Sequence, residues 1–267
     1  TVIDLTDGDR SAFLSWVSGA PVRIGFNDEH QWRGRCYTEV VHSEPGVQHR
    51  IDRDLESLKS MGIQAGSKDL HLWLTSEEID SADQLLNQLG VQRSQSIAIL
   101  QPGARYWFKA WPPERFAALA DQLTSLYGCQ VLIGGSNQDI DLALQIRQMS
   151  KSNPIIMAGR TTIKQFAAIA KKSVLFVGND SGAMHIASAV GTPVVALFGP
   201  SSLREWGPRG GPVEVLYKGL DCRICYNTTC TRGEESCMKL IAVHEVAAAT
   251  QRLLQVRSPI AKGKAEG

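Results

Sequence analysis

The sequence predicts an α/β protein built on parallel β-sheets, and three observations carry this prediction. Short runs of consecutive apolar residues recur between residues 96 and 198, and amphipathic helical patterns separate them. The runs end in glycine, proline or polar residues, which are typical of loops at strand ends. Strands that are apolar throughout and alternate with helices form a parallel sheet covered on both faces. We therefore expect a Rossmann-like domain over residues 94–256, preceded by part of a second α/β unit over residues 1–93.

The elements of the larger domain follow from these runs. A helix is expected between Pro113 and Gly128, because proline suits the first helical turn and glycine the residue just past the end. Further helices carry Leu142 and Phe166, and another spans residues 182–190. The strands are predicted at 96–100, 130–133, 154–157, 174–177 and 193–198.

The first ninety residues are less regular. Strands at 2–5 and 22–26 flank a helix at 10–17, and further helices are predicted at 51–61 and 76–89. This pattern matches the end of an α/β unit whose opening strands are absent, so the N-terminal domain is expected to be incomplete. The domain junction is placed near residues 90–95. The polar, aperiodic residues 257–267 are expected to be disordered.

Composition excludes several classes of protein. The chain has 267 residues, 43% of them hydrophobic, and a net charge of +1, which is unlike a nucleic-acid-binding protein. No run approaches the roughly 18 apolar residues of a membrane span. The first residues, from Thr1, lack the basic and apolar segments of a signal peptide. A cytoplasmic protein with reduced cysteines is therefore expected.

The strongest functional motif is Gly-Asn-Asp-Ser-Gly-Ala-Met-His at residues 178–185, where a buried strand meets a helix. Ligands of open parallel sheets bind at this end of the strands. Ser181 is expected to cap the helix, and the N–H groups from Gly182 onward favour an anion such as a diphosphate. Asp180 can accept hydrogen bonds from sugar or ribose hydroxyls. The alternative is a capped helix with Asp180 solvated at an ordinary turn.

A second motif occupies residues 101–112, in the loop that follows the first strand of the same sheet. Because parallel strands end at one edge, this loop shares that edge with Asp180. Arg105 and Lys109 can neutralise phosphates there. The alternative is an aromatic-rich loop that packs on the sheet while its basic side chains stay solvated.

Together the two motifs resemble glycosyltransferase family 9, the lipopolysaccharide core heptosyltransferases. The resemblance rests on residues 178–185, on Gly-Thr-Pro-Val-Val-Ala-Leu-Phe-Gly-Pro-Ser at 191–201 and on residues 101–111. It extends over roughly residues 1–255. The sequence of residues 101–111 is most similar to that of the heptosyltransferase III type, which adds a side heptose to the core.

This resemblance implies a GT-B fold with two Rossmann-like domains, an ADP-L-glycero-D-manno-heptose donor and a lipid A-core acceptor at the cytoplasmic face of the inner membrane. It implies no cofactor. The implied contacts are Lys109 with the donor phosphates, Ser181 and Gly182 with the diphosphate, Asp180 with the sugar, Asp139 with the ribose and Thr161 with the adenine, while His185 lies one helical turn behind them.

The implied reaction is a metal-independent displacement that inverts the anomeric carbon, with Lys109 and Asp180 as the catalytic residues of this chain. The family's general base precedes Thr1 and is expected to be absent, with Asp4 as the second choice. The chain is then expected to bind nucleotide without transferring sugar. The alternatives are an inactive nucleotide-binding fragment and a GT-B enzyme that uses a UDP-sugar.

Four cysteines, Cys222, Cys225, Cys230 and Cys237, lie within a short segment. They could supply four thiolates to zinc or iron. Their spacing matches no standard zinc finger, and a loop of reduced thiols needs no ion. No metal is therefore predicted.

Overall fold

The computed structural model describes residues 1–28, 30–43, 48–220, 222, 225 and 230–257. The chain divides into two compact units. The first unit comprises residues 1–68 and 202–207, and the second comprises residues 69–201 and those from 208 onward. This division falls earlier in the chain than the junction expected near residues 90–95, because helix α3 (Ser76–Gln88) packs against helix α6 (Ile163–Lys172) of the second unit.

The first unit contains a three-stranded parallel sheet in the order β1-β2-β3. The two strands and the first two helices predicted here are confirmed, whereas the third strand was not anticipated. The elements are β1 (Val2–Asp4), α1 (Asp9–Val17), β2 (Arg23–Phe26), the 3-10 helix η1 (Trp32–Cys36), β3 (Glu39–Val41), α2 (Arg50–Lys59) and α8 (Leu203–Trp206).

A buried arginine organises the carboxyl edge of this small sheet. The Arg53 guanidinium lies 2.5 Å from Asp7 and 3.0 Å from Asp28, and it stacks over the Phe26 ring at 3.9 Å. Burying a charge is unfavourable unless it is paired, and here two carboxylates pair with it. Loops after β1 and β2 are thereby tied to α2.

The second unit is built on a six-stranded sheet in the order β6-β5-β4-β7-β8-β9, in which every neighbouring pair is parallel. This is the strand order of a doubly wound Rossmann sheet, with its switch point between β4 and β7. The strands are β4 (Ile97–Gln101), β5 (Gln130–Ile133), β6 (Ile155–Ile156), β7 (Leu175–Asn179), β8 (Val194–Phe198) and β9 (Val213–Tyr217).

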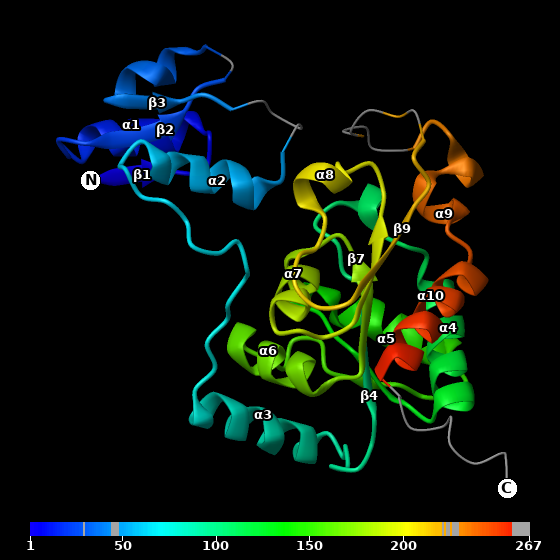
Figure 1. Ribbon diagram of the computed structural model, residues 1–267. Coiled ribbons are helices and arrows are strands. Elements are labelled where there is room, and N and C mark those ends of the chain that lie inside the picture. Colours follow the sequence, from blue (N-terminus) through cyan, green and yellow to red (C-terminus); the bar gives the residue numbers. More distant parts are fainter. Residues whose placement is uncertain (29, 44–47, 221, 223–224, 226–229, 258–267) are drawn as a thin grey trace, which may run out of the picture. The chain divides into compact units, whose positions relative to one another are not determined.

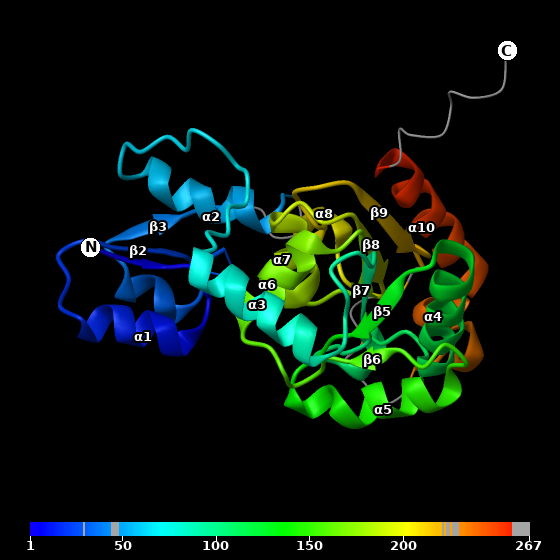
Figure 2. The same ribbon diagram turned by 90° about the horizontal axis from the view of Figure 1, so that it is seen from below.

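Helices cover both faces of this sheet, as the apolar strands predicted. Helices α4, α5 and α10 lie on one face and α6 and α7 on the other (Figures 1 and 2). Their bounds are α4 (Pro113–Tyr127), α5 (Ile140–Met149), α7 (Gly182–Ala189) and α10 (Val243–Arg257), with the short elements η2 (Trp107–Lys109), η3 (Asn137–Asp139), η4 (Gly233–Glu235) and α9 (Cys237–Leu240). Strand β9 and helix α10 were not predicted. Apart from Arg257, which ends α10, the expected tail at 257–267 lies outside the described residues.

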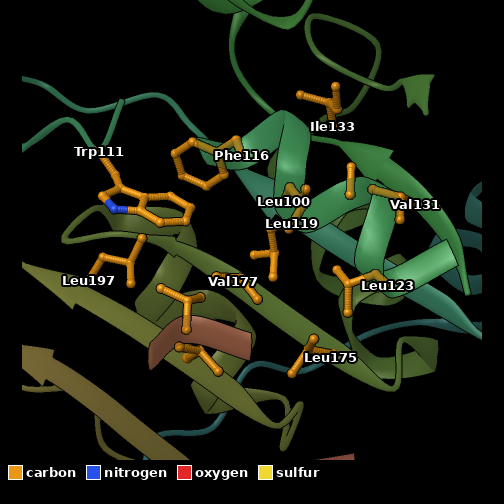
Figure 3. Packing of buried hydrophobic residues seen from close by; sticks show 14 of the residues in the cluster. Leu100, Trp111, Phe116, Leu119, Leu123, Val131, Ile133, Leu175, Val177 and Leu197 are labelled. Carbon is orange, nitrogen blue, oxygen red and sulfur yellow. The ribbon is translucent and has the colours of Figure 1, made fainter. Parts of the chain in front are cut away.

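The main core lies between the sheet and helices α4, α5 and α10. Alternate residues of each strand point into it, as Ala98 and Leu100 do from β4, while Leu119 and Leu123 enter from α4. Figure 3 shows Trp111 at the margin of this core, and its ring meets Phe116 edge-on at a centroid distance of 4.9 Å. The loop that follows β4 is therefore held by the core itself.

Candidate functional site

A cavity of about 560 Å³ opens at the carboxyl ends of the strands in the second unit. It lies at the sheet's switch point, where helices on either side of β4 and β7 diverge and leave a crevice. Its walls come from the loops after β4, β5, β6 and β7. The lining residues are Gln101, Gly103, Ala104, Arg105, Gly135, Ser136, Gln138, Asp139, Thr161, Thr162, Ile163, Phe166, Ser181, Gly182, Ala183 and Ile186.

Four of the predicted site residues line this cavity, namely Asp139, Thr161, Ser181 and Gly182. Arg105 also reaches it, with its guanidinium 5.4 Å from the Tyr106 ring. Lys109, Asp180 and His185, all of which the structure describes, do not line it. The structure therefore brings together predicted residues from three different loops, far apart in the chain, at one edge of the sheet.

The N-terminus of α7 forms one wall, and its details differ from expectation. Ser181 occupies the N-cap position with extended backbone, but its hydroxyl makes no capping hydrogen bond. Its buried Oγ has no hydrogen-bond partner among the atoms that the structure describes. Ser181 is thus the N-cap residue, as predicted, but its side chain does not make the hydrogen bond that usually accompanies this position. Because an unpaired buried hydroxyl is unfavourable, this group and the free N–H groups of α7 favour an anionic ligand.

Gly182 leaves this wall open. A Cβ atom added there would meet no atom of the protein within 4 Å, although Gly182 lines the cavity. The space that the side chain would occupy is therefore space available to a ligand. This agrees with the expected close approach of a ligand to the backbone at Gly182.

Lys109 and Asp180 form an ion pair beside the cavity. The Lys109 Nζ lies 2.6 Å from Asp180 Oδ2, and the Asp180 side chain is only 7% exposed. A desolvated carboxylate of this kind is unfavourable without its partner. The pair joins the loop after β4 to the loop after β7, so each residue holds the other at the edge of the sheet.

Asn179 is a positioning residue that the sequence did not reveal. Its fully buried side chain donates from Nδ2 to the Pro102 carbonyl at 2.7 Å and accepts from the Trp111 N–H at 3.1 Å. These two bonds fasten both ends of the loop that carries Lys109. The signal was the Asn-Asp pair at the end of β7, but only the three-dimensional structure shows that Asn179 binds the backbone at both ends of the loop while Asp180 pairs with Lys109 within it.

Asp139 is held by a capping box at η3. Its Oδ2 accepts from Ser136 N at 2.7 Å and from Ser136 Oγ at 2.8 Å. Glycines make room for this carboxylate, since a Cβ at Gly103 would lie 2.5 Å from Asp139 Oδ1 and one at Gly135 would lie 2.6 Å from Asp139 Cβ. Asp139 consequently presents a carboxylate to the cavity in a fixed position.

Asp4, the second choice for a general base, belongs to the first unit. Its carboxylate accepts from Thr6 N at 2.9 Å, Thr6 Oγ1 at 2.8 Å and Tyr37 Oη at 2.8 Å. Burial acts to raise the pKa of Asp4, but hydrogen bonds from Ser11, Thr6 and Tyr37 outweigh burial and lower the pKa. A carboxylate with a lowered pKa is a weak base, so these contacts favour a structural role for Asp4.

The four clustered cysteines line a separate small cavity of about 20 Å³, together with Arg232, whose Nε donates to Cys222 Sγ at 2.9 Å. None of the six cysteines, all of which the structure describes, forms a disulfide. The pKa of Cys237 is raised, first by burial and then by the neighbouring thiols. Within the described residues, no group of three or more His, Cys, Asp and Glu side chains has the arrangement of a metal site.

That the four clustered cysteines bind no metal stays a prediction, and elemental analysis of the purified protein tests it. We expect far less than one equivalent of zinc or iron, and a melting temperature that chelators leave unchanged. A structural zinc contributes on the order of 10 kcal/mol of binding free energy, so its removal would be evident. Stoichiometric metal, or thiols that resist labelling until EDTA is added, would contradict the prediction.

The strand order and the cavity at the switch point place the protein in the class of Rossmann-like α/β proteins. A match to a protein-family model identifies the family within this class. The chain belongs to glycosyltransferase family 9 (heptosyltransferase), whose model matches residues 1–235. The protein is therefore a glycosyltransferase, as the motifs at 101–111 and 178–185 predicted.

Individual relatives agree with this assignment. The chain is 30% identical to lipopolysaccharide heptosyltransferase 3 of Escherichia coli K12, with 99% of this chain and 77% of the relative covered. Its fold matches a glycosyltransferase family 9 crystal structure from Veillonella parvula with a TM-score of 0.81 and 25% identity, covering 96% and 74% of the two chains. It also matches the structure of E. coli ADP-heptose lps heptosyltransferase II with a TM-score of 0.75 and 22% identity, covering 96% and 76%. The expected GT-B type of fold, built from Rossmann-like units, is confirmed.

Proposed function

We propose that this glycosyltransferase transfers heptose from ADP-L-glycero-D-manno-heptose to the inner core of lipopolysaccharide, with inversion at the anomeric carbon and without a metal ion. The observation that carries the proposal is the cavity in the second unit, where Asp139, Ser181 and Gly182 meet at the sheet's switch point. Two of the three similar proteins named above support the sugar and the acceptor, since one is a lipopolysaccharide heptosyltransferase and another an ADP-heptose lps heptosyltransferase.

Each group in the cavity has a place in donor binding under this proposal. The N–H groups of α7 and the Ser181 hydroxyl bind the diphosphate. The Asp139 carboxylate accepts hydrogen bonds from the ribose hydroxyls, as carboxylates in this position of Rossmann sheets do. Thr161, in the loop before α6, lies toward the adenine. His185 follows Gly182 by one helical turn on α7.

Lys109 changes partners when the donor binds. In the structure its ammonium pairs with Asp180. A bound diphosphate, carrying more charge than one carboxylate, competes for this ammonium. Lys109 then stabilises the charge that develops on the departing ADP, while Asp180 is released to accept hydrogen bonds from the sugar hydroxyls. As the new glycosidic bond forms and the bond to ADP breaks, the proton of the acceptor hydroxyl passes to the family's general base, a carboxylate that the resemblance places ahead of the position of Thr1.

Calorimetric titration with ADP, UDP and GDP, followed by ADP-heptose, UDP-glucose and GDP-mannose, tests the donor. We expect binding of ADP and ADP-heptose in preference to the others. Tighter binding of UDP and UDP-glucose would favour the alternative of a UDP-sugar enzyme. Nucleotide binding without transfer to a heptose-deficient lipopolysaccharide acceptor would favour a nucleotide-binding protein without activity.

Gly182→Ala is expected to weaken ligand binding while leaving the stability of the fold nearly unchanged. The added Cβ would meet no protein atom within 4 Å, so the free energy of unfolding should stay within about 1 kcal/mol of the parent value. ADP binding should weaken by about 1.5–3 kcal/mol, the value of hydrogen bonds to a charged group, because the methyl group occupies the diphosphate position. Calorimetry measures the affinity and thermal unfolding the stability.

Gly66→Ala is the matched control, because a Cβ at Gly66 in the first unit also meets nothing within 4 Å. It should leave ADP binding unchanged. Equal ADP affinities for Gly182→Ala and the parent protein would remove the α7 N-terminus from the donor site.

The proposed acceptor is anchored in a membrane through lipid A, so we place the reaction at the cytoplasmic face of the inner membrane, with peripheral contact. Among the helices of the described residues, none combines the length and apolarity needed to cross a bilayer. Neither ADP-heptose nor the lipid A-core acceptor requires a nucleic acid, and the net charge of +1 is in keeping with this.

A further inference from the structure

Trp73 is the most exposed large apolar side chain among the described residues, at 81% relative exposure. An indole left in water is unfavourable, and exposed aromatic rings commonly belong to binding surfaces. Its ring stacks on His71, with centroids 6.2 Å apart and planes inclined by 23°. Trp73 lies in the second unit, in the segment just before α3.

Three contacts place this segment beside the nucleotide cavity. Helices α3 and α6 lie side by side (Figures 1 and 2). Lys164, Gln165 and Lys172 of α6 meet Glu78, Ser81 and Asp83 of α3 in the same order along both helices. The two helices therefore run in the same direction, and the residues before α3 lie next to the start of α6.

The backbone of Trp73 is fastened to that start directly, because Lys164 Nζ donates to the Trp73 carbonyl. The neighbouring Ile163 begins α6, lines the cavity and is 68% exposed. Phe166, one turn further on, lines the same wall. Ile163 and Phe166 thus form an apolar part of the cavity lining, and Trp73, which does not line the cavity, is tied through its carbonyl to the residue that follows Ile163.

We propose that Trp73 is a base-stacking residue, which covers the nucleobase of the bound nucleotide against the Ile163 and Phe166 wall. This deepens the proposed function and rests on it. Charged and hydrogen-bonding groups gather around the diphosphate and ribose positions, at Gly182 and Asp139, so the apolar end is left for the base. Aromatic stacking accepts any base, so Trp73 contributes affinity, and discrimination among bases falls to other groups.

The test compares Trp73→Ala, Trp73→Phe and the parent protein for binding of ADP and of inorganic pyrophosphate, which has no base. Loss of one base stack weakens binding about five- to 160-fold, so Trp73→Ala should bind ADP at least about fivefold more weakly. Trp73→Phe keeps an aromatic face and should recover most of the affinity. The affinity for pyrophosphate should be the same in all three proteins, which a merely structural role for Trp73 would not give.

Trp32→Ala is the matched control, because Trp32 is 52% exposed and belongs to the first unit. It should leave ADP binding unchanged. Parental ADP affinity in folded Trp73→Ala, or an equal loss of ADP and pyrophosphate affinity, would overturn the inference and leave the proposed function standing. Failure of the parent protein to bind ADP would instead overturn the proposed function, and the inference with it.

Discussion

Replacing Lys109 with alanine is expected to weaken ADP binding by about 1.5–3 kcal/mol, the value of a charge-assisted hydrogen bond. If Lys109 also stabilises the charge on departing ADP, sugar transfer, measured in a form of the protein that carries the family's general base, should fall further, by about 10²–10³ in kcat, as when one electrostatic donor is removed from other active sites. Calorimetry with ADP and steady-state transfer with ADP-heptose measure the two effects separately.

Because Lys109 forms an ion pair with Asp180, the Lys109→Ala experiment needs controls for protein stability and for the carboxylate. Lys109→Ala leaves Asp180, 7% exposed, without this partner, so the free energy of unfolding must be measured beside the affinity. Asp180→Asn removes the carboxylate that competes for Lys109, and it should keep or raise ADP affinity while impairing transfer. A folded Lys109→Ala protein with parental ADP affinity would remove Lys109 from the donor site.

The second large effect is on stability. Trp111→Ala should lower the free energy of unfolding by about 3–5 kcal/mol, as truncation of buried aromatic residues does. Trp111 is 2% exposed, stacks edge-on against Phe116 and donates from Nε1 to the Ile241 carbonyl at 2.8 Å. The variant leaves a cavity in the core, and the Ile241 carbonyl keeps only the hydrogen bond from Arg115 Nη1 at 2.6 Å. Denaturant unfolding measures the loss.

Two matched variants show how much of the stability loss is due to burial of the Trp111 ring and how much to its hydrogen bond. Trp107→Ala removes a neighbouring tryptophan that is 47% exposed, and it should change stability much less. Trp111→Phe keeps an aromatic ring but loses the hydrogen bond to Ile241, and its cost should lie between the two. A loss below about 1 kcal/mol for Trp111→Ala would show that the core does not hold the loop.

Prediction from sequence succeeded where local pattern and burial coincide. The five strands expected in the second unit are all present, and four of them, β4, β5, β7 and β8, are almost wholly buried, which requires the apolar runs visible in the sequence. Strand β6, at one edge of the sheet, is half-buried, but its run is still apolar. Strand β9, at the other edge, is also half-buried, and Glu214 interrupts its apolar run, so it was missed. A half-buried edge strand needs fewer apolar residues, so its sequence carries a weaker signal.

The sequence predicted which residues lie at the site, but it did not predict the contacts that these residues make. The rule that parallel strands end at one edge predicted that the loops of Lys109 and Asp180 meet, and the family resemblance added Asp139 and Thr161, which line one cavity with Gly182. It could not show that the Ser181 hydroxyl makes no capping hydrogen bond, or that Lys109 pairs with Asp180. Those facts depend on side-chain torsions and on distances of a few ångströms between distant segments.

The sequence by itself determined the α/β class and the alternating order of elements, because both follow from local hydrophobic periodicity. It also determined the family, because the family's motifs are contiguous in the chain. Only the tertiary structure decided that Asn179 fastens the loop of Lys109, that four cysteines share one cavity, and that Trp73 stands beside α6. Such contacts join residues far apart in the chain. Their geometry follows from how helices and strands pack, and no single segment specifies it.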